Sequence, residues 1–208
     1  TPDNVIVDIG KTEAIIPVNE RMPTERYRQG QRLKLYIKEV ERSAKGPQVI
    51  ASRAHHNLLR DLLILEIPEI AAGTVEIKGI AREAGYRSKV AVYTRQPGID
   101  PVGCCVGLRG IRIQNIVNEL NNEKIDVVQW SEDPRIFIAN ALSPAQVLSV
   151  TLNQAENTAL VKVPDKHLSL AIGKEGQNVR LAAKLTGWRI DIKSASEIEA
   201  EKEAHRIE

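Results

Sequence analysis

The sequence predicts an α+β multidomain protein in which a small all-β unit precedes two copies of one mixed module. Residues 1–54 contain short apolar segments separated by Gly and Pro turns, a pattern typical of strands. Further along, Gly107–Gly110 and Gly173–Gly176 are two G-x-x-G turns. Each follows an apolar segment and opens an amphipathic helix that leads into a strand containing Ile-Asp. The turns lie 66 positions apart and the strands 65, which indicates an internal duplication.

The amino-terminal unit is expected to be a small barrel. Closely spaced short strands with Gly and Pro turns favour an OB-fold, and we expect its first strand to be missing from residues 1–54. Tyr27 and Tyr36 are the only aromatic residues there. Because single-strand binders stack bases on aromatic side chains, we expect the barrel to bind weakly or to act as a spacer. The expected strands cover residues 5–9, 13–17, 33–37 and 49–51.

The first mixed module is expected at residues 55–133. Leucines at helical spacing predict a helix from His56 to Ile70 that stops near Pro68. Asp100-Pro101 starts another helix, since Asp can cap it and Pro suits its first position. After the G-x-x-G turn, apolar residues follow helical spacing at Ile113, Ile116, Val117 and Leu120. The other expected elements are strands at 74–80, 89–93 and 124–130, and a short helical turn at 81–85.

The second module, at residues 134–194, repeats this order. Asp133-Pro134 starts a helix that runs to about Leu142, and Asp165 is expected to cap the segment leading to Ile172. Gly187 provides a left-handed stop for the helix after the second turn. Residues 195–208 carry five acidic and two basic residues and form an acidic tail, expected as an exposed helix with a Ser cap. Strands are expected at 147–152, 160–163 and 189–192.

The charge balance and the cysteines limit the function classes. The 29 basic and 27 acidic residues leave a net charge of +2, so any nucleic-acid binding needs localised charge. Residues 135–194 hold eight basic and four acidic residues, which predicts positive potential on the second module. The only cysteines, Cys104 and Cys105, are adjacent, which disfavours a disulfide or a zinc site and favours a reducing cytoplasm. We expect a cytoplasmic monomer with no signal peptide, membrane segment, metal, cofactor or catalytic residues.

The repeated turn carries the functional prediction. A helix N-terminus exposes unpaired N–H groups and a partial positive charge. Two glycines three positions apart allow a tight bend and remove Cβ atoms that would block a phosphate group. An apolar groove beside the bend could then receive bases. These features together favour binding of single-stranded RNA.

This arrangement resembles KH domains, whose G-x-x-G loop clamps about four nucleotides. The helix–strand–strand–helix–turn–helix–strand order resembles the bacterial, type-II version. Together with a barrel that resembles the ribosomal-protein-S-one type, it gives a partial OB-fold followed by two tandem type-II KH domains. Further motifs lie within Val5–Gly10, Glu13-Ala14, Val75–Gly85, Cys105–Gly110 and Ala171–Ala182. Through these motifs, almost the whole chain resembles the NusA family of bacterial transcription factors.

The resemblance implies binding to nascent single-stranded RNA, with effects on pausing, termination and antitermination and without catalysis. It implies RNA polymerase and other elongation factors as partners of a full-length protein. We expect the family's polymerase-contacting domain to be absent here, so that the chain binds RNA without delivering it to polymerase. The implied RNA-binding residues are Gly107, Leu108, Arg109, Gly110 and Arg112 in the first loop, and Gly173, Lys174, Glu175, Gly176, Gln177, Asn178 and Arg180 in the second.

Glu175 departs from the pattern, because a carboxylate in the loop repels phosphate, although Lys174 and Arg180 could compensate. It leaves open a protein-interaction scaffold that docks other transcription or ribosomal proteins. An RNA-processing enzyme is a third possibility, which is disfavoured because no paired carboxylates or metal ligands converge by spacing. Trp130 and Trp188 are expected to pack between modules rather than to stack on bases.

Overall fold

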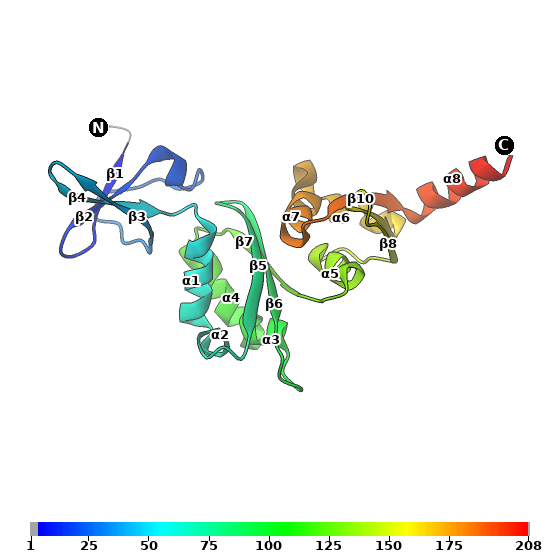
Figure 1. The fold of residues 1–208 in the computed structure, drawn as a ribbon, viewed down its shortest axis with the longest axis horizontal. Coiled ribbons are helices and arrows are strands. Elements are labelled where there is room, and N and C mark those ends of the chain that lie inside the picture. Colours follow the sequence, from blue (N-terminus) through cyan, green and yellow to red (C-terminus); the bar gives the residue numbers. More distant parts are fainter. Residues whose placement is uncertain (1–3, 208) are drawn as a thin grey trace. The chain divides into compact units, whose positions relative to one another are not determined.

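The computed structural model describes residues 4–207 (Figure 1). Within them, no helix combines the length and the apolar character needed to cross a membrane. The chain divides into two compact units. The first contains residues up to Thr74 with Arg82–Ser88 and Gly103–Ile125, and the second contains Val75–Ala81, Lys89–Val102 and residues from Asp126 onward.

A four-stranded sheet forms the amino-terminal part of the first unit, as predicted. Its strands are ordered β1-β2-β4-β3, with β1–β2 and β3–β4 antiparallel and β2–β4 parallel. A short 3₁₀ turn, η1 (Val18–Glu20), follows β2. Alternate side chains of the strands point inward and form a small aliphatic core of Ala14, Ile16, Val49 and Ala51. The strands are β1 (Val5–Asp8), β2 (Glu13–Ile16), β3 (Tyr36–Ser43) and β4 (Gly46–Ser52).

The predicted strand at 33–37 is largely wrong, because β3 begins only at Tyr36 and continues to Ser43. The backbone N–H and carbonyl of Lys34, which would bond to a neighbouring strand in a sheet, form hydrogen bonds with side chains instead. Its N–H donates to Glu119 Oε1 at 3.0 Å, and its carbonyl accepts from Arg53 Nη1 at 2.9 Å. Hydrophobic alternation alone could not reveal these two side-chain partners.

The first mixed module contains a three-stranded sheet ordered β5-β6-β7. Its central strand β6 is buried at six of seven positions, as expected for a strand with a neighbour on each side. The helix α1 buries Leu58, Leu59, Leu62 and Leu63, which is the predicted stripe. The elements are α1 (His56–Glu66), α2 (Pro68–Ala71), β5 (Glu76–Glu83), β6 (Arg87–Tyr93), α3 (Pro101–Val106), η2 (Leu108–Gly110), α4 (Ile111–Glu119) and β7 (Lys124–Gln129).

The helical turn predicted at 81–85 is wrong, since β5 continues to Glu83 and a tight turn leads into β6. Glu123, which is fully buried, fixes this turn from a distant part of the sequence. Its carboxylate accepts from the Arg82 guanidinium at 3.1 Å, from the Gly85 N–H at 2.7 Å and from Ser88 Oγ at 2.9 Å. The conformation therefore depends on a tertiary contact rather than on local propensity.

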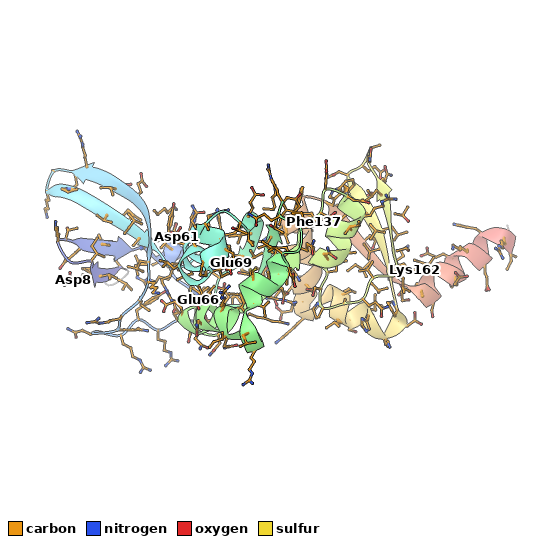
Figure 2. The ribbon with its side chains drawn as sticks, turned by 90° about the horizontal axis from the view of Figure 1, so that it is seen from below. Asp8, Asp61, Glu66, Glu69, Phe137 and Lys162 are labelled. Atoms are coloured by element: carbon orange, nitrogen blue, oxygen red, sulfur yellow. The ribbon has the colours of Figure 1, made fainter. Side chains whose placement is uncertain are left out.

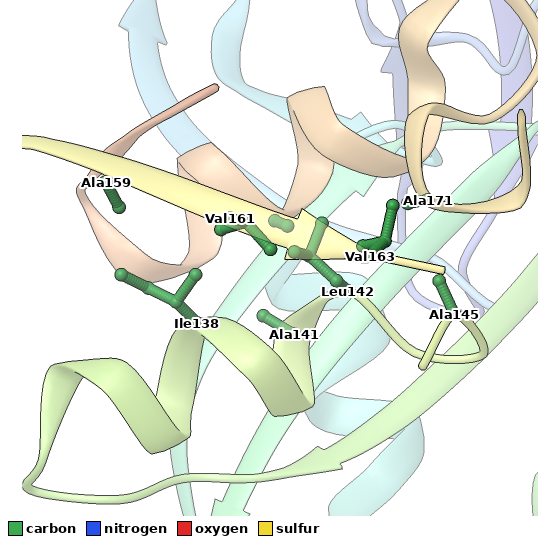
Figure 3. Close-up of a cluster of buried hydrophobic side chains, with 9 residues drawn as sticks. Ile138, Ala141, Leu142, Ala145, Ala159, Val161, Val163 and Ala171 are labelled. Carbon is green, nitrogen blue, oxygen red and sulfur yellow. The ribbon is translucent and has the colours of Figure 1, made fainter. Parts of the chain in front are cut away.

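The second module repeats the same element order. Its sheet is ordered β10-β9-β8, with β9–β10 parallel and β8–β9 antiparallel. Figure 3 shows Ile138 and Ala141 of α5, and Leu142 directly after it, facing Val161 and Val163 of β9 across the core. The elements are α5 (Pro134–Ala141), β8 (Ser149–Asn153), β9 (Thr158–Val163), η3 (Asp165–His167), α6 (Leu168–Ile172), η4 (Lys174–Gly176), α7 (Gln177–Thr186), β10 (Arg189–Ser194) and α8 (Ala195–Ile207).

The two tryptophans have different environments. Trp130 packs edge-on against Phe137, which Figure 2 labels, at 6.4 Å between ring centroids, and Lys78 Nζ lies 4.6 Å above its ring. It therefore joins the two modules, as predicted. Trp188 packs against the core of the second module.

The acidic tail is an exposed helix, α8. Ser194 and Glu197 cap its N-terminus. The Glu197 N–H donates to Ser194 Oγ and the Ser194 N–H donates to Glu197 Oε2, both at 3.2 Å, which is a capping box. Asp165 does not cap the segment leading to Ile172 as predicted. Its carboxylate accepts from the N–H and Oγ of Ser196 and so anchors the start of α8.

Candidate nucleic-acid interface

The two G-x-x-G turns adopt the same backbone conformation. Gly107 and Gly173 have φ/ψ angles of 77°/175° and 79°/167°. Gly110 and Gly176 have 74°/13° and 72°/14°, in the left-handed region. These are conformations that glycine adopts without steric cost, so the duplication extends to the backbone angles themselves.

The third position of each turn is also left-handed, although it is not glycine. Arg109 has φ 54° and Glu175 has φ 55°. A side chain in this region costs roughly 1–2 kcal/mol, so the fold of each module imposes the bend. Both residues are exposed. The bend therefore presents a cation in the first loop and a carboxylate in the second.

Identical backbone hydrogen bonds close the two turns. The first glycine donates its N–H to the preceding helix, from Gly107 to the Gly103 carbonyl at 2.9 Å and from Gly173 to the Ser169 carbonyl at 2.8 Å. In both turns the last glycine donates to the carbonyl of the first at 3.1 Å. The turns are thus fixed before any ligand arrives.

The first position of each turn requires glycine for a different reason from the one that the sequence suggested. A Cβ on Gly107 would lie 2.7 Å from Arg112 Cγ, and a Cβ on Gly173 would lie 2.7 Å from the backbone N of Asn178. These glycines make room for the protein's own following helix. A Cβ on Gly110 would meet nothing within 4 Å, so only the last glycine leaves open space in which a phosphate could approach.

Arg112 and Asn178 occupy equivalent positions, five residues after the first glycine, and both tie the turn to the preceding helix. Arg112 Nη1 donates to the Cys104 carbonyl and to Glu69 Oε2, both at 2.8 Å. The pKa of Glu69, labelled in Figure 2, lies below its ordinary value because its own backbone N–H and Arg112 both donate to the carboxylate. Asn178 Nδ2 donates to the carbonyls of Ala171 at 2.9 Å and Leu142 at 3.0 Å.

These contacts change the roles expected for the two residues. Asn178 is fully buried, so its side chain is not exposed for the RNA contact that the family resemblance implied. Arg112 is partly exposed, but its guanidinium is already engaged by the protein. We therefore assign both residues to positioning the loops. Arg180 Nη1 donates to the Glu175 carbonyl at 2.9 Å and supports the second loop in a similar way.

The loop tips and their apolar flanks are exposed. Leu108 is 84% exposed at the tip of the first loop, and Ile111 follows it at 58%. Beside the second loop, Leu170 and Ile172 are 44% and 36% exposed. Each loop therefore places apolar surface next to its bend, which is the surface that unstacked bases can contact.

Both helices that start at the loops lack a side-chain cap. Gly110 is the N-cap of α4 and Gly176 the N-cap of α7, and neither supplies a side-chain acceptor. An anion can take the place of that acceptor at the positive end of each helix dipole. Arg109 and Lys174, both exposed, add one cation to each loop.

A third group of cations, which the sequence predictions did not include, lies in the barrel. Residues 21–34 contain five basic residues and one acidic residue, a local density that could have been read from the sequence. Arg26, Arg28 and Arg32 of this segment are exposed and lie around a hollow of about 610 Å³. The second module is therefore not the sole concentration of positive charge.

Among residues 4–207, no three His, Cys, Asp or Glu side chains gather in an arrangement that could hold a metal ion. Cys105 is buried and Cys104 partly buried in α3. His167 Nδ1 accepts from the Gln146 N–H at 2.9 Å, which gives it a structural contact.

Comparison with known families covers most of the chain. Residues 1–51 match the S1 RNA binding domain, residues 53–130 the NusA-like first KH domain, and residues 134–200 the NusA-like second KH domain. The chain belongs to the NusA family. The predicted order of an OB-type barrel followed by two KH domains is thereby confirmed.

Curated NusA proteins with the name transcription termination/antitermination protein NusA match closely. The one from Halalkalibacterium halodurans is 60% identical over 93% of this chain and 50% of its own length. Those from Bacillus subtilis and Thermus thermophilus are 58% and 55% identical over 93% and 92% of this chain, and 52% and 50% of their own lengths. The chain thus spans about half the length of these relatives and corresponds to the S1–KH–KH region of NusA.

Proposed function

We propose that this chain is the RNA-binding region of a transcription factor that holds nascent single-stranded RNA and modulates pausing, termination and antitermination. RNA polymerase and other elongation factors are the proposed partners of the whole protein. The chain itself acts as a non-catalytic, cytoplasmic monomer.

The observation that carries the proposal is the pair of matching loops. Each one combines a left-handed bend, an uncapped helix N-terminus, an exposed cation and an exposed apolar flank. Phosphate needs the first three features, and a base needs the last. An enzyme would need converging acid, base or metal groups as well, and the loops offer none.

The test replaces the exposed loop residues with aspartate. Leu108→Asp with Arg109→Asp, and Lys174→Asp with Glu175→Asp, place carboxylates at the bends, and Asp tolerates the left-handed conformation at the third position. Binding of a randomised-sequence 12-nucleotide RNA pool is measured by fluorescence anisotropy. We expect each pair to weaken binding roughly tenfold or more, because a charge-assisted phosphate contact is replaced by repulsion.

The matched control is Ala44→Asp with Lys45→Asp, which introduces the same charges at the exposed turn between β3 and β4. We expect it to bind RNA nearly as the parent chain does. Equal affinities for the parent, the control and both loop variants would refute the proposal.

A scaffold that docks other transcription or ribosomal proteins is the second candidate, and Glu175 is the observation that favours it. This exposed carboxylate takes the backbone position of Arg109 and faces the same kind of surface. If the second loop contacts protein instead of RNA, the Lys174–Glu175 variant will retain full RNA affinity while the Leu108–Arg109 variant loses it.

A further inference from the structure

His55 caps the first helix of the first mixed module with its ring. It is the N-cap of α1, and its Nδ1 accepts from the Asn57 N–H at 3.0 Å. An imidazole that accepts at Nδ1 is neutral and carries its proton on Nε2. Helices are usually capped by Ser, Thr, Asp or Asn, none of which gains a proton between about pH 5 and 8, whereas histidine does.

The same residue ends the segment Ser52–His55, which connects β4 of the barrel to α1 and is called the joint below. The His55 N–H donates to Ser52 Oγ at 2.9 Å, and its carbonyl accepts from Arg82 Nη1 of β5 at 2.7 Å. Its ring stacks on Tyr36 of β3 at 4.8 Å between centroids and on His56 at 4.3 Å. His55 therefore contacts the barrel and the first mixed module at the same time.

A buried carboxylate fixes the other end of the joint. Glu20 Oε2 accepts from Ser52 Oγ at 2.6 Å, and its Oε1 pairs with Lys38. The Glu20 carbonyl accepts from the N–H groups of Arg53 at 2.9 Å and Ala54 at 3.2 Å. Each residue of the joint thus forms at least one hydrogen bond that holds its position.

The charged groups around the His55 ring come from four elements. Three are basic, namely His56 of α1, Lys38 of β3 and Arg82 of β5, and the fourth is Glu20 of η1, which already pairs with Lys38. The pKa of His55 lies below its ordinary value of 6.5, because burial removes water from the ring and because the three basic groups repel a further positive charge. The surroundings therefore favour the neutral ring that the cap requires.

Protonation at Nδ1 would remove this cap. The Asn57 N–H would then face an N–H of the ring, and the new cation would lie at the positive end of the α1 dipole. Asn57 Nδ2 also donates to the Tyr36 hydroxyl at 3.1 Å, so fraying of the first turn of α1 would weaken its contact with β3. Because the folded-state pKa is lowered, the cap contributes fully above about pH 6.5 and is lost as the pH falls through the pKa of His55.

We propose that His55 makes the joint between the barrel and the first mixed module sensitive to protons. The joint is fixed while the imidazole is neutral, and it loosens when Nδ1 takes up a proton. This property goes beyond the function proposed above and does not depend on the G-x-x-G loops.

The experiment measures native-state amide exchange of the full chain at about pH 7.5 and about pH 5, with each rate divided by the rate of an unstructured reference at the same pH. The Asn57 N–H reports the cap, and the N–H groups of Arg53 and Ala54 report the joint. At the lower pH we expect protection of Asn57 to fall roughly fivefold or more, as for the loss of a typical cap, and protection of Arg53 and Ala54 to fall at least about twofold.

The start of α5 provides an internal reference. There the Arg135 N–H donates to Asp133 Oδ1 at 3.0 Å. The pKa of Asp133 lies below its ordinary value because the Arg135 side chain and N–H both donate to its carboxylate, so this cap stays ionised at both pH values. Protection of the Arg135 N–H should therefore not change.

His55→Asn is the decisive variant, because asparagine is a strong N-cap that does not titrate. It should keep protection of Asn57 within about twofold between the two pH values, whereas His55→Ala should lack this protection at both. His56→Gln is the control for the neighbouring histidine. It should retain the pH response of the parent, with a midpoint at higher pH because one basic neighbour is gone.

Two results would overturn the proposal at the cap. One is a parent chain whose Asn57 protection is the same at both pH values, and the other is a His55→Asn chain that loses protection as the parent does. A loss confined to Asn57, with Arg53 and Ala54 unchanged, would also overturn it, since the joint itself would then be insensitive to protons.

Discussion

Replacing Gly173 by alanine tests whether the first glycine of the turn is required by the following helix. The new Cβ would lie 2.7 Å from the Asn178 backbone N and 2.8 Å from its Cβ. Asn178 cannot easily move away, because its buried amide donates to the carbonyls of Ala171 and Leu142. The backbone must therefore shift, or two buried hydrogen bonds must weaken.

Gly176→Ala, at the last glycine of the same turn, is the comparison variant that lacks the close contact. It has nearly the same positive φ, 72° against 79°, but its new Cβ would meet only Arg180 Nη1, at 3.9 Å. Gly176→Ala incurs the left-handed cost of about 1–2 kcal/mol. Gly173, at φ 79° and ψ 167°, lies in a region that is essentially restricted to glycine, so its replacement costs about 1–3 kcal/mol in backbone strain. Overpacking adds about 1–3 kcal/mol, and we expect a total loss of about 2–6 kcal/mol for Gly173→Ala.

The assay is native-state hydrogen exchange of the amides in α6 and α7, because it reports the free energy of opening for this module alone. Gly107→Ala should fall between the other two, since the atom nearest its new Cβ belongs to the flexible side chain of Arg112. If Gly173→Ala lowers the opening free energy no more than Gly176→Ala does, the packing explanation is wrong.

Three further outcomes follow from the contacts described. Arg53→Met should lower the unfolding free energy of the first unit by about 3–5 kcal/mol in urea titration, because it leaves Glu25 buried without its partner, and an undiminished midpoint would contradict this. Burial raises the pKa of Tyr27 to about 12. The neutral phenol therefore contributes fully to the free energy of unfolding below about pH 10, and this contribution is lost as the pH rises through about 12. Tyr27→Phe should therefore destabilise the chain at pH 8 and lose stability less steeply than the parent above pH 10, and parallel curves would exclude this. Glu175→Gln should strengthen binding of the 12-nucleotide RNA severalfold at low salt, and this gain in affinity should shrink as salt rises. An unchanged affinity would mean that the second loop does not lie near a phosphate group.

The sequence predicted the loops well because their signal is local. A left-handed bend needs glycine, a helix start needs a cap or an anion, and a duplicated pattern shows both features twice. The Asp133-Pro134 start of α5 was predictable for the same reason, and Asp133 Oδ1 does accept from the Arg135 N–H at 3.0 Å. The left-handed stop at Gly187 has φ 75°.

The errors share one cause, which is contact between residues far apart in the sequence. Glu123 fixes the turn after β5 from 38 positions beyond Gly85. Arg53 and Glu119 occupy the backbone of Lys34 and delay the start of β3. Asp165 anchors α8 across 31 positions instead of capping its own segment.

By itself, the sequence determined the order of the modules, the duplicated turns and the residue types at their tips, because these depend on backbone conformation and on neighbours a few positions away. Only the tertiary structure decided which polar side chains face solvent. Asn178 lies inside although it follows an exposed loop, and Arg26 and Arg32 border a hollow whose two carboxylates both pair with Arg53. Burial and ion pairing depend on what packs against a residue, and that information is not local.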